Sequence, residues 1–163
     1  MEGRNKDYRR ERVPSYKEKT KTERDSVDSF FSKLNFNDKW ITEGADSLFV
    51  VYAENVGRYM APLFQNDKQC LTKSQIRNVY GEIKRIQFKR VETIEGKTSF
   101  MLLKPKVAYA EGRNKTKGLS LFKKVFDKAW SITSENLNDM TYGNFCALLE
   151  AILAYHKAYG GKD

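Results

Sequence analysis

Apolar residues recur at intervals of three and four through most of the chain, which is the spacing of one face of an α-helix. Such stripes predict helices over 46–61, 73–91 and 99–113. A further stripe over 119–130 and a last one that begins near Thr141 complete the series. No stretch alternates apolar and polar residues over the length of a strand, so no sheet is predicted.

Local signals mark where these helices begin and end. Thr72 can cap the second helix, with Gln75 three residues later as its capping-box partner. Gly96 and Gly118 are expected to lie in breaks on either side of the third helix. Pro105 is expected to kink that helix because proline removes one intrahelical hydrogen bond. The fold class predicted is therefore all-α, a compact bundle of about five helices.

The first 45 residues differ from the helical domain predicted over 46–163. Residues 1–24 mix charged side chains with no hydrophobic period, which is typical of an extended basic segment without a core of its own. We therefore divide the chain into a basic, aromatic-containing N-terminal extension, 1–45, and the helical domain.

The second half of the extension is too apolar to be a free tail. Asp25 or Ser26 could cap a short helix there. We expect this stretch to dock on its own domain or on a neighbouring subunit, and one hypothesis is that Trp40, Phe30 and Phe31 dock on an adjacent copy of the chain.

Charge changes this picture from a plain helical bundle to a candidate binding protein. The formal net charge is +9, and residues 73–117 hold twelve Lys and Arg against four Asp and Glu. An excess of this kind inside a folded segment favours a polyanionic partner, with nucleic acid first and a membrane surface second. The alternative is a solvated helix face that serves only solubility.

On a helical wheel the cations of 73–91 fall on one edge of the buried stripe. Lys73, Arg77 and Lys84 share this edge, and Tyr80 lies between it and the apolar positions. Such side chains neutralise phosphates without reading sequence, and a tyrosine beside them could stack on a base. A tyrosine at a helix edge is also common as half-buried core.

The next helix repeats this arrangement. Lys106, Tyr109 and Arg113 are spaced to share a face, and Lys104 flanks it. We expect the cations of both helices to converge into one solvent-facing ridge that follows phosphates. Tyr109 is a second candidate for base stacking.

The sequence offers no set of residues that would form a catalytic or metal-binding site. His156 is the single histidine, lies on an apolar helix face, and is expected to pack in the core. Small helical ribonucleases carry an Arg and a His with four to six residues between them, but positions 149–151 hold no arginine. Cys70 and Cys146 are expected to be reduced thiols in a cytoplasmic protein. We predict no enzyme activity, no catalytic residues, no cofactor, no metal and no membrane partner, because the apolar runs are too short to span a bilayer.

Two runs of residues carry a resemblance to a known family. Leu71–Asn78 resembles the Leu-Thr-Thr-Ser-x-(Leu/Ile)-Arg-Asn helix start of the small subunit of the type III-A CRISPR–Cas (Csm) effector complex. Leu103–Arg113 resembles that family's Leu-Lys-x-Lys-x-x-Tyr-x-x-Gly-Arg segment. The resemblance covers residues 70–160, and the long N-terminus departs from the short one expected of the family.

The resemblance implies an all-helical, non-catalytic structural subunit of an RNA-guided interference complex. Several copies stack beside the backbone subunits and line the channel that holds the guide RNA and the target RNA, and they contact the RNA backbone without base specificity. Target cutting belongs to the backbone subunit, and the DNase and cyclic-oligoadenylate activities belong to the large subunit. Arg77, Lys104, Lys106 and Arg113 fall on matching motif positions, whereas Lys73 and Lys84 follow from the wheel alone.

Two alternatives from other classes stay open at this point. A stand-alone basic helical DNA-binding regulator would need side chains aimed at base edges, and Arg77 with Asn78 could supply them. A cryptic ribonuclease would depend on His156.

Overall fold

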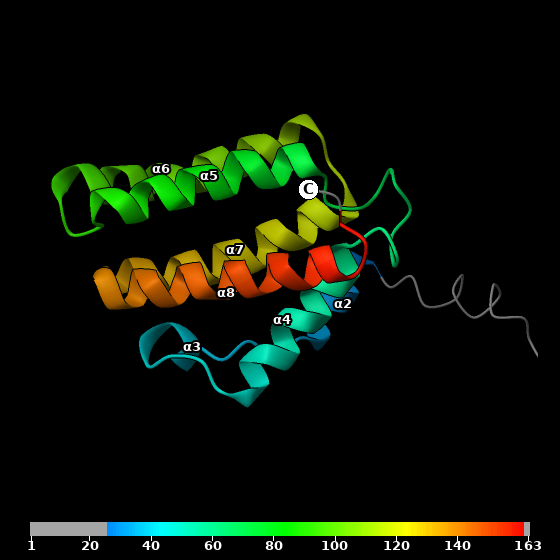
Figure 1. The fold of residues 1–163 in the computed structure, drawn as a ribbon, viewed down its shortest axis with the longest axis horizontal. Coiled ribbons are helices and arrows are strands. Elements are labelled where there is room, and N and C mark those ends of the chain that lie inside the picture. The colour runs from blue at the N-terminus through cyan, green and yellow to red at the C-terminus, as the bar shows by residue number, and fades with distance from the viewer. Residues whose placement is uncertain (1–25, 162–163) are drawn as a thin grey trace, which may run out of the picture.

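The computed structural model describes residues 26–161, which form seven α-helices and no strand (Figure 1). The helices are α2 Val27–Lys33, α3 Lys39–Thr42, α4 Ser47–Met60, α5 Lys73–Lys89, α6 Ile94–Arg113, α7 Lys117–Glu135 and α8 Asp139–Ala158. The all-α class is confirmed. The predicted count of about five helices is not met, because two short helices, α2 and α3, precede the five long ones. The basic segment predicted over 1–24 lies outside the described residues.

The start of α5 follows the predicted capping box. The Thr72 hydroxyl accepts a hydrogen bond from the Gln75 backbone N–H at 3.4 Å, and the Gln75 side-chain oxygen accepts one from the Thr72 N–H at 2.9 Å. The Gln75 side-chain nitrogen also donates to the Asn114 backbone oxygen at 3.2 Å. Gln75 therefore links the first turn of α5 to the residue that follows α6.

Two predicted breaks are wrong. Gly96 lies in the first turn of α6, because Thr93 caps that helix earlier than expected and its hydroxyl accepts from the Gly96 N–H. Gly118 lies in the first turn of α7, where a Cβ would come within 2.4 Å of the Leu71 backbone nitrogen. Both positions need glycine for close approach of backbone, not for a turn. Pro105 lies inside α6, which continues through it.

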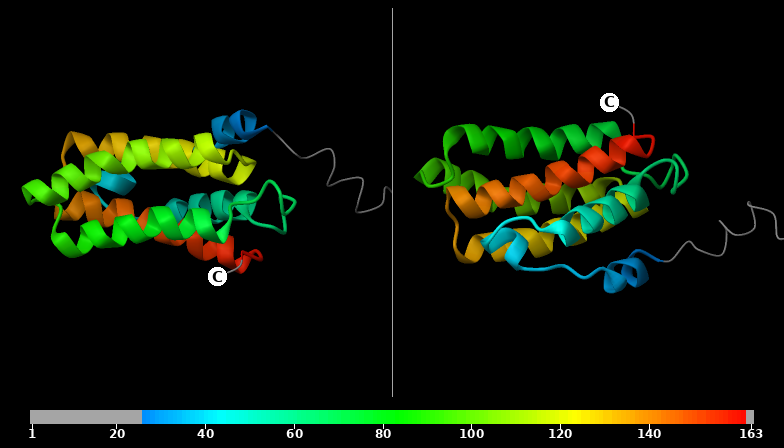
Figure 2. Two further views of the ribbon diagram at one scale, coloured as in Figure 1. Left: turned by 90° about the horizontal axis from the view of Figure 1, so that it is seen from above. Right: turned by 60° about the horizontal axis from the view of Figure 1, so that its bottom comes forward.

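The helices form layers around one apolar core. In Figure 1, α7 and α8 run across the middle, the α5–α6 hairpin lies on one side of them, and α4 lies on the other with α2 and α3. The right view in Figure 2 again shows α8 between α5 and α4. Rings from α6, α7 and α8 meet in the core, where Phe100 lies edge-on to Tyr142 and Phe145, and Phe126 lies edge-on to Phe145.

The aromatic residues before α4 pack on their own domain. Trp40 is 2% exposed, and its indole N–H donates to the Asp46 carboxylate at 2.8 Å. Phe30 stacks on Tyr59 with ring centroids 4.1 Å apart, and Phe31 also packs against the core. This stretch therefore docks on its own domain, one of the two expected places, and Trp40 is buried there. Docking of the partly buried Phe30 and Phe31 on an adjacent copy stays a prediction. The division of the chain into 1–45 and 46–163 stays a prediction, since only part of the first range is described.

Candidate nucleic-acid interface

Helix α5 presents polar side chains on both sides of its buried stripe. Val79, Ile83 and Ile86 face the core. Because the helix turns 100° per residue, the positions on either side of this stripe point toward α8 or toward α6. A groove lies on each side, and we call them the α5–α8 groove and the α5–α6 groove.

The α5–α8 groove has a volume of about 390 Å³. It is lined by Lys73, Ile76, Arg77, Tyr80, Glu150, Leu153, Ala154, His156 and Lys157. Lys73 and Arg77 are exposed, and neither forms an ion pair within residues 26–161. These two side chains are therefore available to an anion at one end of the groove.

The other end of this groove is closed by a polar cluster. Tyr80 donates a hydrogen bond to the Glu150 carboxylate at 3.1 Å, and Lys84 forms an ion pair with the same oxygen. Lys84 also lies over the Tyr80 ring, 5.4 Å from its centroid. The hydrogen bond to Glu150 raises the pKa of Lys84, and burial raises the pKa of Tyr80. The charge of Lys84 is thus balanced by a carboxylate.

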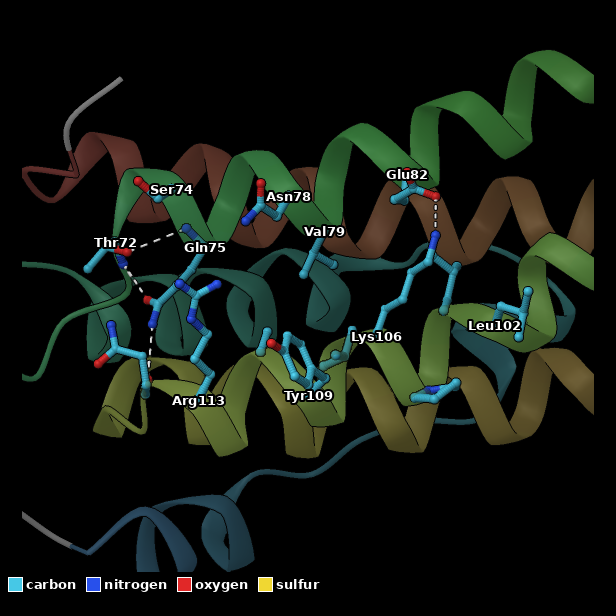
Figure 3. A pocket seen from close by; sticks show the side chains of 15 residues that line it. Thr72, Ser74, Gln75, Asn78, Val79, Glu82, Leu102, Lys106, Tyr109 and Arg113 are labelled. Atoms are coloured by element: carbon cyan, nitrogen blue, oxygen red, sulfur yellow. Dashed lines mark hydrogen bonds and ion pairs between the residues drawn. The ribbon is translucent and has the colours of Figure 1, made fainter.

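The α5–α6 groove is larger, about 770 Å³, and has an apolar floor (Figure 3). Lys106 reaches across it to the Glu82 carboxylate at 2.6 Å. The hydrogen bond from Lys106 holds the pKa of Glu82 below its ordinary value. Figure 3 shows Tyr109 and Arg113 following along α6, and the Tyr109 side chain is 70% exposed. This groove is lined by Thr72, Ser74, Gln75, Asn78, Val79, Glu82, Leu102, Leu103, Pro105, Lys106, Val107, Tyr109, Ala110, Arg113 and Asn114.

The cations predicted as one ridge are divided among three places. Arg77 lines the α5–α8 groove and Lys106 lines the α5–α6 groove. Lys104 lies on neither, because its ammonium sits 4.6 Å from the centroid of the Trp130 ring. The expected convergence is therefore wrong: the two edges of α5 face different neighbours. Which of these cations contact RNA is not decided by their placement and stays a prediction.

Sequence reasoning missed the contribution of α8. Glu150, Leu153, Ala154 and Lys157 line the α5–α8 groove at the spacing i, i+3, i+4 and i+7. The same spacing occurs at Lys73, Ile76, Arg77 and Tyr80 on α5. A search for two helices with matching part-polar stripes could have found this pair.

His156 is a core residue, as predicted. It is 2% exposed, and its Nε2 lies 3.1 Å from the Leu71 backbone oxygen. Burial lowers the pKa of His156 below its ordinary value of 6.5. Cys70 and Cys146 are both buried, and burial raises the pKa of the Cys146 thiol to about 11. Within 26–161, no three or more His, Cys, Asp or Glu side chains gather to hold a metal ion.

This burial predicts a pH dependence of stability. Between the lowered pKa in the folded state and 6.5, the unfolded chain binds a proton at His156 that the folded chain does not. The free energy of unfolding is therefore expected to fall as the pH drops from about 7.5 to about 5.5. Thermal melts across this range, with His156→Gln as the control, measure the effect. A variant whose melting temperature changes with pH as steeply as the wild type would contradict this assignment.

No helix within residues 26–161 combines the length and the apolar character that crossing a membrane requires.

The fold and the two grooves define a small all-helical protein with charged side chains along both sides of α5. The family model described as Csm2 Type III-A matches residues 44–162, and the chain belongs to this family. It is a small subunit of the type III-A CRISPR–Cas (Csm) complex. The family is one of structural subunits, so the other subunits of that complex are its partners. No curated protein and no solved structure gives a significant match.

Membership of this family confirms the resemblance seen in the two motifs, and the matched range contains both. It leaves the stand-alone DNA-binding regulator without support.

Proposed function

We propose that the protein is a non-catalytic subunit that binds the backbone of the guide and target RNA within the Csm complex, in several stacked copies. The observation that carries this proposal is the pair of exposed cations at one end of the α5–α8 groove. Lys73 and Arg77 lie one helical turn apart, and neither is balanced by an acidic partner within the described residues. Cations so placed attract phosphates irrespective of base sequence.

The other predicted contacts have a secondary place in this proposal. Lys84 and Lys106 are already paired with Glu150 and Glu82, so a phosphate must compete with a carboxylate for each of them. Arg113 lines the α5–α6 groove and Lys104 lies beside Trp130, away from both grooves. We propose that these four cations make secondary contacts with the RNA backbone rather than the main ones.

A few contacts in each copy give weak binding, and this favours several copies acting along one strand. Each neutralised phosphate on a single strand contributes a salt slope of roughly −0.7, so two principal contacts leave a shallow dependence in one chain. Linked copies raise the effective concentration of each further contact.

The salt dependence of RNA binding tests this proposal. Lys73→Ala and Arg77→Ala are each expected to reduce the slope of log K against log salt by roughly 0.7 for single-stranded RNA. Fluorescence anisotropy with a labelled strand and its scrambled version measures the slope. Lys97→Ala is the matched control, because Lys97 is an exposed lysine on α6 that lines neither groove.

Equal affinity for the two strand sequences is the expected result, since phosphate contacts carry no sequence information. A marked preference for one sequence or for duplex DNA would contradict the proposal. Slopes that stay at the wild-type value in both groove variants would contradict it as well. Cleavage of RNA that His156→Ala abolishes would show an enzyme instead.

A further inference from the structure

The lining of the α5–α8 groove includes apolar side chains that a phosphate alone would not contact. Its ends are polar, but its middle is apolar, formed by Ile76, Leu153 and Ala154. A phosphate held by Lys73 and Arg77 would leave this apolar surface in water. The surface is therefore suited to a ligand that carries an anionic group and a flat apolar body together.

The order of side chains along the groove follows from the antiparallel course of α5 and α8 (Figure 1). Tyr80 meets Glu150, which begins the α8 stripe. Lys73, seven residues before Tyr80, thus lies toward the end of the α8 stripe where Lys157 stands. Seven residues of helix span ~10 Å, so Lys73 stands about that far from the tyrosine along the helix axis, and Arg77, three residues before Tyr80, stands about half as far.

We propose that this groove holds one unpaired nucleobase of the bound RNA strand, with the adjoining phosphate on Lys73 and Arg77. This inference rests on the proposed function. The base lies over the apolar middle and stacks against the Tyr80 ring. Because the groove reads only the flat face of the base, it accepts any of the four bases.

Tyr80 is fixed in place before any ligand arrives. Its hydroxyl is held by Glu150, and Glu150 is held in turn by Lys84. A ring restrained in this way loses little rotamer freedom on binding, which preserves the stacking free energy. Tyr109 has no hydrogen bond of this kind within the described residues and is 70% exposed, so its ring is not held in position in the same way.

The size of the groove favours a nucleobase over a protein segment as its occupant. About 390 Å³ falls in the range of sites for small molecules, which is ~300–1,000 Å³. A partner helix would need a continuous apolar groove, whereas here Tyr80 and Glu150 bridge the two helices and close one end. Positive charge at the other end favours a nucleotide.

The test compares intact and abasic strands on the full chain. A single-stranded RNA and a strand of the same length that lacks its bases present the same phosphates. Wild-type protein is expected to bind the intact strand about tenfold more tightly, because one stacked base is worth roughly that factor. Tyr80→Ala is expected to remove this difference and to leave the abasic affinity unchanged. Tyr80→Phe, which keeps the ring, is expected to retain most of the preference.

The outcomes distinguish this inference from the proposed function. Equal affinities of wild-type protein for the two strands would overturn the base site, and so would a Tyr80→Ala variant that keeps the wild-type preference. The salt slope of the Lys73 and Arg77 variants tests backbone binding separately. If Tyr80→Ala bound both strands as wild type does but failed to enter the Csm complex, the groove would be a protein contact and the inference wrong. Thermal melts of each variant confirm that it folds.

Discussion

Replacing Trp40 by alanine is expected to lower the free energy of unfolding by about 3–5 kcal/mol, the range for removal of a buried large aromatic side chain. The ring packs against Tyr52 and Phe49, with centroids 5.1 Å and 5.9 Å away. Its N–H also donates to Asp46, whose carboxylate caps α4. The alanine variant therefore loses apolar contacts and a restraint on the capping carboxylate together. Urea unfolding followed by circular dichroism measures the change.

Trp40→Phe is the matched control, because it keeps an aromatic ring and removes the indole N–H. It is expected to cost only about 1–2 kcal/mol, from the lost hydrogen bond and a small loss of volume. An isolated Trp40→Ala chain as stable as wild type would show that the tryptophan serves another molecule instead of its own core.

Replacing Gly57 by alanine is expected to destabilise the protein by about 1–3 kcal/mol, as overpacking of a core does. A Cβ on Gly57 would come within 2.6 Å of the Ile152 backbone oxygen and 2.7 Å of the Tyr155 Cβ. Backbone atoms cannot rotate away, so α4 and α8 must separate. For a chain of this length, each kcal/mol lowers the melting temperature by about 2–4 °C.

Gly81→Ala provides the control for Gly57→Ala. Gly81 is also inside a helix, but no atom of a neighbouring side chain or segment lies within 4 Å of the point that a Cβ would occupy there. Alanine at this position is expected to stabilise α5 by about 0.5–1 kcal/mol through helix propensity. Opposite signs for the two variants are the expected result, and a stabilising Gly57→Ala would contradict the close approach of α4 and α8.

Local signals in the sequence predict the long helices well. The capping box of Thr72 and Gln75 places the start of α5 because both hydrogen bonds form between residues three apart. Helix α3 is missed, since four residues are too few to show a period. The start of α6 is missed because Gly96 resembles a break, and only its approach to the Arg90 backbone explains a glycine there.

The candidate site is predicted less completely than the fold. A helical wheel places Lys73, Arg77 and Tyr80 on one edge of α5, and the structure puts all three in one groove. The wheel cannot tell what faces that edge. Glu150, which balances Lys84 and holds Tyr80, comes from a helix far along the chain. Such a contact depends on the tertiary arrangement, so the residues near α5 in the sequence cannot predict it.

The hydrogen bond from Gln75 to Asn114 has a mechanical consequence. Helices α5 and α6 are joined at one end by their connecting turn and at the other by this bond, so they form a closed frame. The width of the space within the frame is thereby set. The space between α5 and α8 is bridged by Tyr80, Lys84 and Glu150, and also by the Tyr142 hydroxyl, which donates to the Ile83 backbone oxygen at 2.7 Å. The walls of both grooves are thus joined by hydrogen bonds before any ligand binds.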